Sequence, residues 1–281
     1  MLPTPHVMRD RVRVFYASCD DNLRGRIFLA DFATQPPFRL IGRSDAPVLD
    51  VGAPGAFDCD GVNPSQIIAT DEGLALLYIG WRRGPAEAPY TLFAGVAHSA
   101  DGGRTFTRQD EPLLPPRPGE RLFRTAPFID RTASGYRLLY IGGDSFVPGA
   151  GERAFPTYSL MQIKSDSLWD WSGPVQTLMV PHLAAGEVGF GRPVILRRAG
   201  QVSLMISVRT REGYQLVETQ AEIEPGVRPA MTPVALEPLD DWERRMTCFG
   251  AVAQVGPYEL LFYNGDGFGR TGMGLAWRLG P

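Results

Sequence analysis

Two acidic side chains, Asp60 and Glu187, stand where the chain could carry acid–base chemistry. Asp60 lies in Phe57-Asp-Cys-Asp-Gly-Val-Asn-Pro64 and Glu187 in Glu187-Val-Gly-Phe-Gly-Arg-Pro193. Cleavage of an acetal needs a carboxylic acid that protonates the leaving oxygen and a carboxylate that acts as nucleophile or activates water. We expect Glu187 to be the acid and Asp60 the base or nucleophile. Two structural roles compete: Asp60 could brace the turn at Gly61, and Glu187 could pair with Arg192.

Arginine dominates the basic residues, since only Lys164 among the 28 Lys and Arg side chains is a lysine. The simplest cause of this ratio is genomic base composition, which says nothing about where the arginines lie. A guanidinium binds a carboxylate or a phosphate through two parallel hydrogen bonds. We therefore expect an anionic substrate, which for a sugar would be a uronic acid, a sialic-acid-like sugar, or a phosphorylated or nucleotide-linked sugar. In the alternative, each arginine pairs with an acid of the chain. The expected substrate-binding residues are Asn63, Trp81, Arg82, Arg124, Asp144, Arg192, Arg209, Arg245, Asn264, Asp266 and Arg270.

Five copies of a strand-like segment organise the chain around these residues. Each copy is an apolar heptad that ends near Tyr or Ser and is followed by small residues. The copies are Val12–Ser18, Leu74–Gly80, Tyr136–Gly142, Val202–Val208 and Tyr258–Asn264, whose first residues are 62, 62, 66 and 56 apart. Even spacing of this kind is typical of repeat architectures.

Each heptad has strand-like neighbours on both sides. A short segment upstream is usually opened by a proline, at Pro5, Pro64, Pro127 and Pro193, and Phe249 takes the proline's place in the fifth copy. Proline is tolerated at the first residue of a strand. A third strand-like segment follows each heptad, and a fourth fits most copies. Three to four antiparallel strands repeated five times predict an all-β, five-bladed β-propeller, formed by residues 1–281 as one domain. A β-sandwich is the rival, but it would not show a period near 60.

Blade topology then sorts the polar residues. In an up-and-down blade, the start of the first strand and the loop between the second and third strands share one end of the propeller, which we name the near face. The remaining turns form the far face. The expected catalytic and substrate-binding residues all fall on the near face, so that opposed charges converge on one funnel. The segment Ser99-Ala-Asp-Gly-Gly-Arg-Thr-Phe106 falls on the far face, between a third and a fourth strand.

The blade period and the strand starts resemble those of the glycoside hydrolase clan that includes arabinanases, xylosidases, invertases and levansucrases, with families 43 and 32 among its members. The resemblance implies an Asp, a second Asp and a Glu acid in three successive blades, and Asp60 and Glu187 sit in places comparable to the first and the last. The middle carboxylate is not evident, because the chain reads Arg124-Thr-Ala-Pro127 where Arg-Asp-Pro is typical of the invertase branch. The far-face segment at 99–106 resembles the Asp-box of sialidases, which is a turn device. A looser resemblance is to propeller domains found beside glycosyltransferases in glycolipid synthesis.

The missing middle carboxylate keeps two alternatives open. One is a non-catalytic carbohydrate-binding or accessory propeller. The other is a non-hydrolytic biosynthetic enzyme, such as a cyclase or lyase, that uses the same arginine-rich funnel.

Composition argues against several other classes. The net charge of −3 does not favour a nucleic-acid partner. No apolar run is long enough to span a membrane, and the first ten residues lack the features of a signal peptide, so the cytoplasm is the expected compartment. The expected partner is a small-molecule or oligosaccharide substrate, and the oligomeric state is left open.

No cofactor is expected. The three cysteines have no zinc spacing, although converging carboxylates would suit a calcium or sodium ion on the propeller axis. The glycines of Gly265–Gly272 are not expected to form a phosphate loop, since the repeat places a strand on each side and no helix follows.

Overall fold

The computed structural model describes residues 1–148, 154–236 and 240–280. The strands form five successive antiparallel groups. The first is β1 (Thr4–Val7), β2 (Val12–Cys19), β3 (Gly25–Phe32) and β4 (Leu40–Arg43). The second is β5 (Gly61–Thr70), β6 (Gly73–Arg83), β7 (Tyr90–Ser99) and β8 (Thr107–Arg108). The third is β9 (Phe123–Thr132), β10 (Gly135–Pro148), β11 (Ala154–Ser165) and β12 (Val175–Met179). The fourth is β13 (Glu187–Arg198), β14 (Gln201–Thr210), β15 (Tyr214–Gln220) and β16 (Thr232–Pro233). The fifth is β17 (Cys248–Val255), β18 (Tyr258–Asn264) and β19 (Met273–Leu279).

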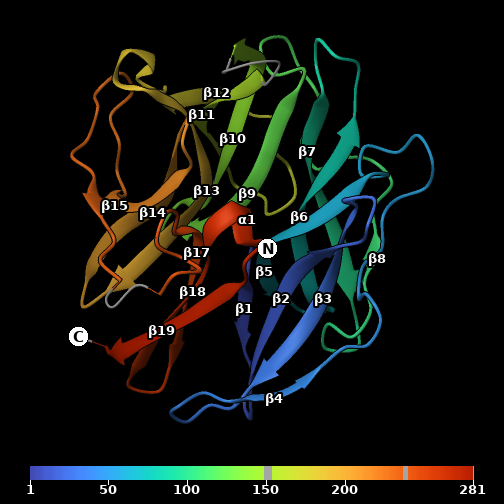
Figure 1. Ribbon diagram of the computed structural model, residues 1–281, viewed down its shortest axis with the longest axis vertical. Helices are drawn as coiled ribbons and strands as arrows, with labels where there is room; N and C mark the ends of the chain where they lie inside the picture. The colour runs from blue at the N-terminus through green and yellow to red at the C-terminus, as the bar shows by residue number, and fades with distance from the viewer. Residues whose placement is uncertain (149–153, 237–239, 281) are drawn as a thin grey trace.

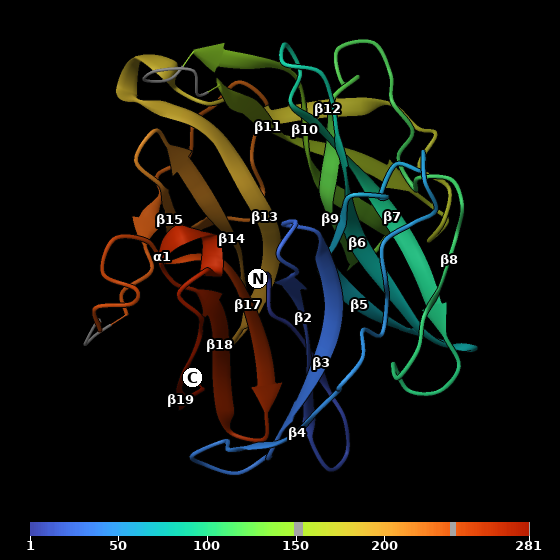
Figure 2. The same ribbon diagram turned by 45° about the vertical axis from the view of Figure 1, so that its right-hand side comes forward.

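These groups are the blades of a five-bladed β-propeller. Figures 1 and 2 show them in chain order around a centre near which the N-terminus lies. The five predicted heptads are β2, β6, β10, β14 and β18, each the second strand of its blade. Blades 2 and 3 also join through a short parallel pairing of β7 with β9, which merges them into one eight-stranded sheet. The fold prediction is therefore confirmed.

The sequence led us to expect that a proline usually opens the first strand of a blade. In the structure, three of these prolines lie further inside the strand. Pro64, Pro127 and Pro193 lie inside β5, β9 and β13, at positions where the register with the second strand shifts. A β-bulge leaves a backbone N–H unpaired and therefore tolerates proline. The residues before two of these prolines, Ala126 and Arg192, have left-handed φ values of 50° and 42°. The bulge thus bends each inner strand near the axis and turns the side chain at this position inward.

A buried acid–tyrosine pair recurs in three blades. The tyrosine comes from the second strand and its hydroxyl meets a carboxylate that lies just before the first strand. The pairs are Asp58 with Tyr78, Glu120 with Tyr140, and Glu243 with Tyr263. Burial raises the pKa of all three tyrosines. The recurrent tyrosine of the heptads is therefore explained by packing, because it anchors the segment that leads into the blade.

The same tyrosines explain why two positions of the third strands are glycines. Cβ atoms added to Gly95 and Gly274 would lie 2.3 Å from the rings of Tyr78 and Tyr263. Only glycine leaves room for the tyrosine ring at these two positions.

The far-face turn at 99–106 is built on Asp101. Its carboxylate accepts hydrogen bonds from the N–H groups of Arg104 (2.8 Å) and Thr105 (3.0 Å), and Gly102 and Gly103 supply positive φ values of 75° and 83°. Phe106 then packs edge-on against Phe15, with ring centroids 5.5 Å apart. The segment ties blade 2 to blade 1.

The glycine-rich loop of blade 5 differs from the expectation in one respect. Strands β18 and β19 flank it as predicted, but the loop itself contains one helical turn, α1 (Asp266–Gly269). Gly267 and Phe268 within it both have left-handed φ values, of 62° and 63°. Figure 1 shows α1 close to the centre of the ring. Among the described residues, no helix is long and apolar enough to cross a membrane.

Candidate functional site

Asp60 lies at the entrance of β5 and keeps part of its carboxylate free. Its Oδ2 accepts a hydrogen bond from the N–H of Arg83 (2.9 Å), and its own N–H donates to the carbonyl of Trp81 (3.1 Å). Among the described residues, the recorded hydrogen bonds reach only this one carboxylate oxygen. Asp60 therefore supports the loop after β6 and still presents an oxygen beside Trp81.

Glu187 is engaged at both oxygens. Its Oε2 accepts the N–H of His182 (2.9 Å), and its Oε1 forms an ion pair with Arg228. The partner is thus Arg228, and not Arg192 as the structural alternative supposed. For Glu187 to protonate a leaving group, this ion pair would have to open.

Several predicted binding residues hold the near-face loops in place. Asp144 accepts from the N–H (3.0 Å) and the Nε (2.7 Å) of Arg121. Asp266 accepts the N–H groups of Arg245 (2.9 Å) and Met246 (2.8 Å). These carboxylates stabilise the chain around the funnel.

Two further predicted residues, Asn264 and Arg124, are buried. Asn264 accepts the N–H of Leu2 (3.1 Å) and donates to the carbonyl of Phe268 (3.1 Å). The Nε of Arg124 lies 3.0 Å from Glu120, and Arg124 also donates to the carbonyl of Pro115 (2.7 Å). Both side chains therefore already have protein partners.

The rim of the funnel holds the remaining candidates. Arg82, Arg245 and Arg270 are exposed and form no ion pair within the described ranges. Trp81 is half-buried, with the guanidinium of Arg83 5.3 Å from its ring. Asn63 is half-buried, and its Oδ1 is a buried atom without a hydrogen-bond partner among the residues that the structure describes. The rim is thus rich in positive charge.

Arg192 occupies the propeller axis. Its guanidinium donates to the carbonyls of Pro3 (2.7 Å), Ser65 (3.2 Å) and Phe249 (2.9 Å) and to the hydroxyl of Thr4 (2.7 Å). These acceptors belong to blades 1, 2 and 5, so one side chain of blade 4 bridges the centre of the ring. Burial lowers the pKa of Arg192 to about 9. A positive charge here does not fit the calcium or sodium ion considered for the axis. No cluster of three or more metal-ligating side chains occurs in the described residues.

Arg209 lies in a different setting, at the near-face end of β14. Its guanidinium carbon is 5.4 Å from the ring centroid of Tyr214, 5.5 Å from Phe155, 5.8 Å from Tyr158 and 6.0 Å from Phe268. It forms no ion pair with any acid in the part of the chain that the structure describes. We name these four rings, with Tyr90, the aromatic cage.

The cage contains hydroxyl groups as well as ring faces. The hydroxyls of Tyr90 and Tyr158 lie 3.3 Å apart. Burial raises the pKa of Tyr214 to about 12 and that of Tyr158 well above its usual range. Burial lowers the pKa of Arg209, but the neighbouring tyrosines raise it further, so the net shift is upward. Arg209 is therefore a stable cation beside Tyr158 and Tyr214, which keep their protons.

The aromatic surface continues beyond the cage. Tyr90 contacts Trp81 and Phe146, with ring centroids 6.4 and 5.4 Å away. Phe123 and Phe190 are fully buried, whereas Phe268 is 40% exposed. A path of rings leads from Trp81, beside Asp60, to Arg209.

Sequence reasoning found Arg209 but missed the tyrosines around it. Tyr90, Tyr158 and Tyr214 each stand at or near the start of the third strand in three successive blades, 68 and 56 residues apart. That repeat was visible in the sequence. Phe155 carried no comparable signal.

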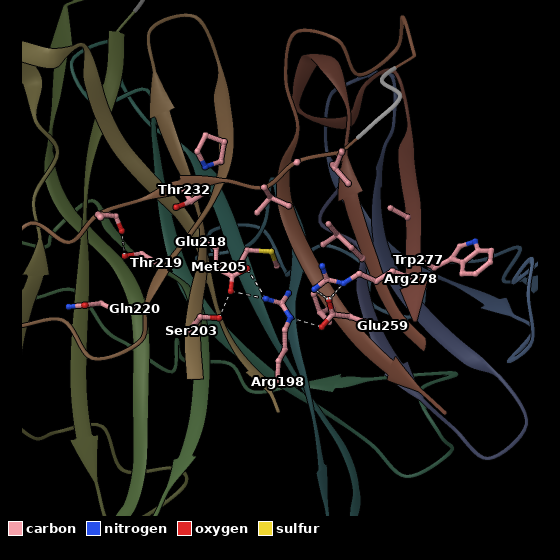
Figure 3. Close-up of a pocket in the computed structure, with 18 residues that line it drawn as sticks. Arg198, Ser203, Met205, Glu218, Thr219, Gln220, Thr232, Glu259, Trp277 and Arg278 are labelled. Carbon is pink, nitrogen blue, oxygen red and sulfur yellow. Dashed lines mark hydrogen bonds and ion pairs between the residues drawn. The ribbon is translucent and has the colours of Figure 1, made fainter. Parts of the chain in front are cut away.

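A groove with a volume of about 790 Å³ lies elsewhere, on the far face between blades 4 and 5 (Figure 3). Its charges neutralise one another: Arg198 bonds Glu218 (2.7 Å) and Glu259 (2.6 Å), and Arg278 bonds Glu259 (2.7 Å). The near-face funnel, where Arg209 has no such partner among the described residues, is therefore the stronger candidate site.

These features define a five-bladed propeller of the kind found in glycoside hydrolases. An α-L-arabinofuranosidase from Lactobacillus brevis superposes with a TM-score of 0.71 at 10% identity, covering 99% of this chain and 89% of that one. A thermostable family-43 glycoside hydrolase gives 0.65 at 10% identity, covering 99% and 88%. A structure from the GH130 family of mannoside phosphorylases, described as containing glycoside hydrolases that target β-1,2 mannosidic linkages in Candida mannan, gives 0.63 at 14% identity, covering 99% and 83%. The resemblance inferred from the sequence is confirmed for the fold.

No protein-family model matches the chain. Two Mycobacterium tuberculosis proteins, the uncharacterized proteins MT1551 and Rv1502, are each 24% identical to it over 281 residues, with 98% of this chain and 91% of each relative covered. The fold is thus shared with solved glycoside hydrolases of very different sequence, at 10 to 14% identity.

Proposed function

We propose that the protein is carbohydrate-active and binds an anionic sugar in the near-face funnel. The observation that carries this proposal is Arg209, a guanidinium surrounded by four aromatic rings and without an acid partner among the described residues. Aromatic faces pack against the apolar faces of sugars, and a guanidinium fork suits an oxyanion. The exposed arginines of the rim add a positive field that attracts such a ligand.

A second candidate function is cleavage of a glycosidic bond by Asp60 and Glu187. The free oxygen of Asp60 beside Trp81 favours it. Asp60 would act as nucleophile or base, and Glu187 would protonate the leaving oxygen after separating from Arg228. The fold shared with glycoside hydrolases supports the same idea. The cytoplasmic location and the single domain expected from the sequence belong to this proposal.

Binding is tested by calorimetry with glucose, glucuronate, N-acetylneuraminate and glucose 6-phosphate. We expect the acidic sugars to bind more tightly than glucose, and Arg209→Gln to abolish the difference. Arg43→Gln is the matched control, because Arg43 lies exposed on β4, the outer strand of blade 1. Preference for the neutral sugar would contradict the proposal.

Cleavage is tested separately with aryl glycosides of the sugar that binds best. Turnover by the wild type that is lost in Asp60→Asn and in Glu187→Gln supports hydrolysis. Binding without turnover supports an accessory or carbohydrate-binding propeller instead.

A further inference from the structure

We propose that the anionic group held by Arg209 is a carboxylate, so that the ligand is a sugar acid rather than a phosphorylated sugar. This inference rests on the proposed function, which leaves the kind of anion open. It assigns Arg209 to the carboxylate and the surrounding rings to the sugar acid that carries it.

The first argument is charge matching. Arg209 is the one cation that stacks on the cage rings in the described part of the chain. Tyr158 and Tyr214 are neutral at physiological pH, because burial raises the pKa of Tyr214 to about 12 and that of Tyr158 well above its usual range. A carboxylate carries one negative charge, whereas a phosphate monoester carries about 1.5 to 2. Burying an unmatched charge is costly, so a site with one cation favours the monoanion.

Among the described residues, the two other buried arginines of the near face, Arg124 and Arg192, already have protein partners and cannot supply a second charge. Arg192 is 2% exposed, and its terminal nitrogens donate to Pro3, Thr4, Ser65 and Phe249. Contact with a phosphate would require these bonds to break. The cage therefore depends on Arg209 alone.

The second argument is shape. A guanidinium presents two parallel N–H groups in a plane, and a carboxylate accepts both in the same plane. Rings from four blades surround Arg209: Tyr90, Phe155 and Tyr158, Tyr214, and Phe268. Flat walls of this kind suit a planar anion, while a tetrahedral phosphate needs donors around three oxygens. The hydroxyls of Tyr90 and Tyr158 lie 3.3 Å apart and form one hydrogen bond with each other, which leaves one of the two protons to donate to a further oxygen of the ligand.

Phe268 makes this selection stricter. It stands on the loop between β18 and β19, 6.0 Å from the guanidinium carbon and 5.8 Å from the ring of Tyr214. Its ring closes one side of the cage, although it is itself 40% exposed. Removing this ring would widen the cage and admit water, which screens unmatched charge. Phe268 is therefore a specificity-determining residue for the same site.

The experiment compares isosteres by calorimetry. The probes are glucuronate, galacturonate and N-acetylneuraminate, the methyl ester of each, glucose and glucose 6-phosphate. A charge-assisted bidentate contact predicts that at least one acid binds about ten- to a hundredfold more tightly than its own ester and than glucose 6-phosphate. Arg209→Gln should bring the acid down to the affinity of the ester, whereas Arg43→Gln should leave both unchanged. Phe268→Ala should narrow the gap between the acid and glucose 6-phosphate.

The outcomes distinguish a failure of the carboxylate assignment from a failure of the proposed anionic-sugar function. If glucose 6-phosphate binds as tightly as every acid, the carboxylate assignment is wrong while the anionic-sugar function stands. If no charged sugar binds better than its neutral counterpart, both are wrong. If an acid keeps its advantage over its ester in a folded Arg209→Gln variant, the carboxylate is held elsewhere and the assignment to Arg209 fails.

Discussion

Arg192 and Arg209 are two arginines of the same blade that reach opposite kinds of environment. Arg192 projects from the bulge of β13 to the axis, where four protein oxygens surround it. Arg209 projects from the end of β14 into the aromatic cage, where only phenols and ring faces surround it. The terminal donors of Arg192 are satisfied by protein oxygens, whereas Arg209 meets only phenol hydroxyls and ring faces and has no acid partner among the described residues.

The difference teaches how to separate structural from functional arginines in this fold. Burial differs between them, since Arg192 is buried and Arg209 is half-buried, but it does not by itself show what each side chain does. The number of acceptors within reach does, since an arginine whose donors are all bonded cannot bind a ligand without unfolding its surroundings. Arg124 holds the fold by this measure, whereas the rim arginines Arg82, Arg245 and Arg270 are exposed and form no ion pair within the described ranges.

The largest expected effect is on the axis. Arg192→Met should lower the free energy of unfolding by about 3 kcal/mol or more, because three carbonyls and one hydroxyl lose their donor in a site closed to water. Urea denaturation of the variant, with Arg43→Met as an exposed control, measures this. An unchanged urea midpoint would mean that other contacts hold the blades together at the centre. The distinction between a structural Arg192 and a ligand-binding Arg209 would then be wrong.

Replacement of Arg209 in the aromatic cage should affect ligand binding more than stability. Arg209→Gln should change the free energy of unfolding by about 1 kcal/mol or less, the scale of a partly exposed cation–π contact, while it removes the preference for acidic sugars. The same denaturation curve and the calorimetry described above give the two readings. A loss of stability as large as that of Arg192→Met would assign Arg209 to the scaffold and remove it from the site.

The pH dependence sharpens the contrast further. The pKa of Tyr214 is raised to about 12 by burial, with Arg209 acting in the opposite direction. The raised pKa means that the folded protein keeps this proton while the unfolded chain loses it near pH 10. The associated stability is therefore complete below about pH 10 and is lost as the pH rises towards 12.

Spectrophotometric titration of tyrosinate tests this order. Of the nine tyrosines, the five with raised pKa values are Tyr78, Tyr140, Tyr158, Tyr214 and Tyr263. We expect these five to ionise above the usual range of a tyrosine, and Tyr214→Phe to remove one late step. A late amplitude unchanged in that variant would place Tyr214 in contact with solvent and open the cage.

The fold could be predicted because it repeats. Five heptads at near-equal spacing are a signal that chance rarely produces, and each became the second strand of a blade. The roles of individual polar residues could not be predicted in this way. The pairing of Glu187 with Arg228 joins residues 41 apart in the chain, and the acceptors of Arg192 come from three other blades. Such contacts depend on side-chain directions that a spacing does not contain. The cage tyrosines were missed as well, although Tyr90, Tyr158 and Tyr214 stand at or near the start of the third strand in three successive blades.

The smallest expected effect concerns the acids, which divide as the arginines do. Asp58 is fully buried against Tyr78 and Arg108, whereas Asp60, two residues later, has one bonded oxygen. Asp60→Asn should change the free energy of unfolding by no more than about 0.5 kcal/mol, because the amide oxygen can still accept the N–H of Arg83. Thermal melting beside Asp58→Asn measures the difference. If Asp60→Asn proved as destabilising as Asp58→Asn, Asp60 would belong to the scaffold, and cleavage by a carboxylate pair in the funnel would lose its nucleophile.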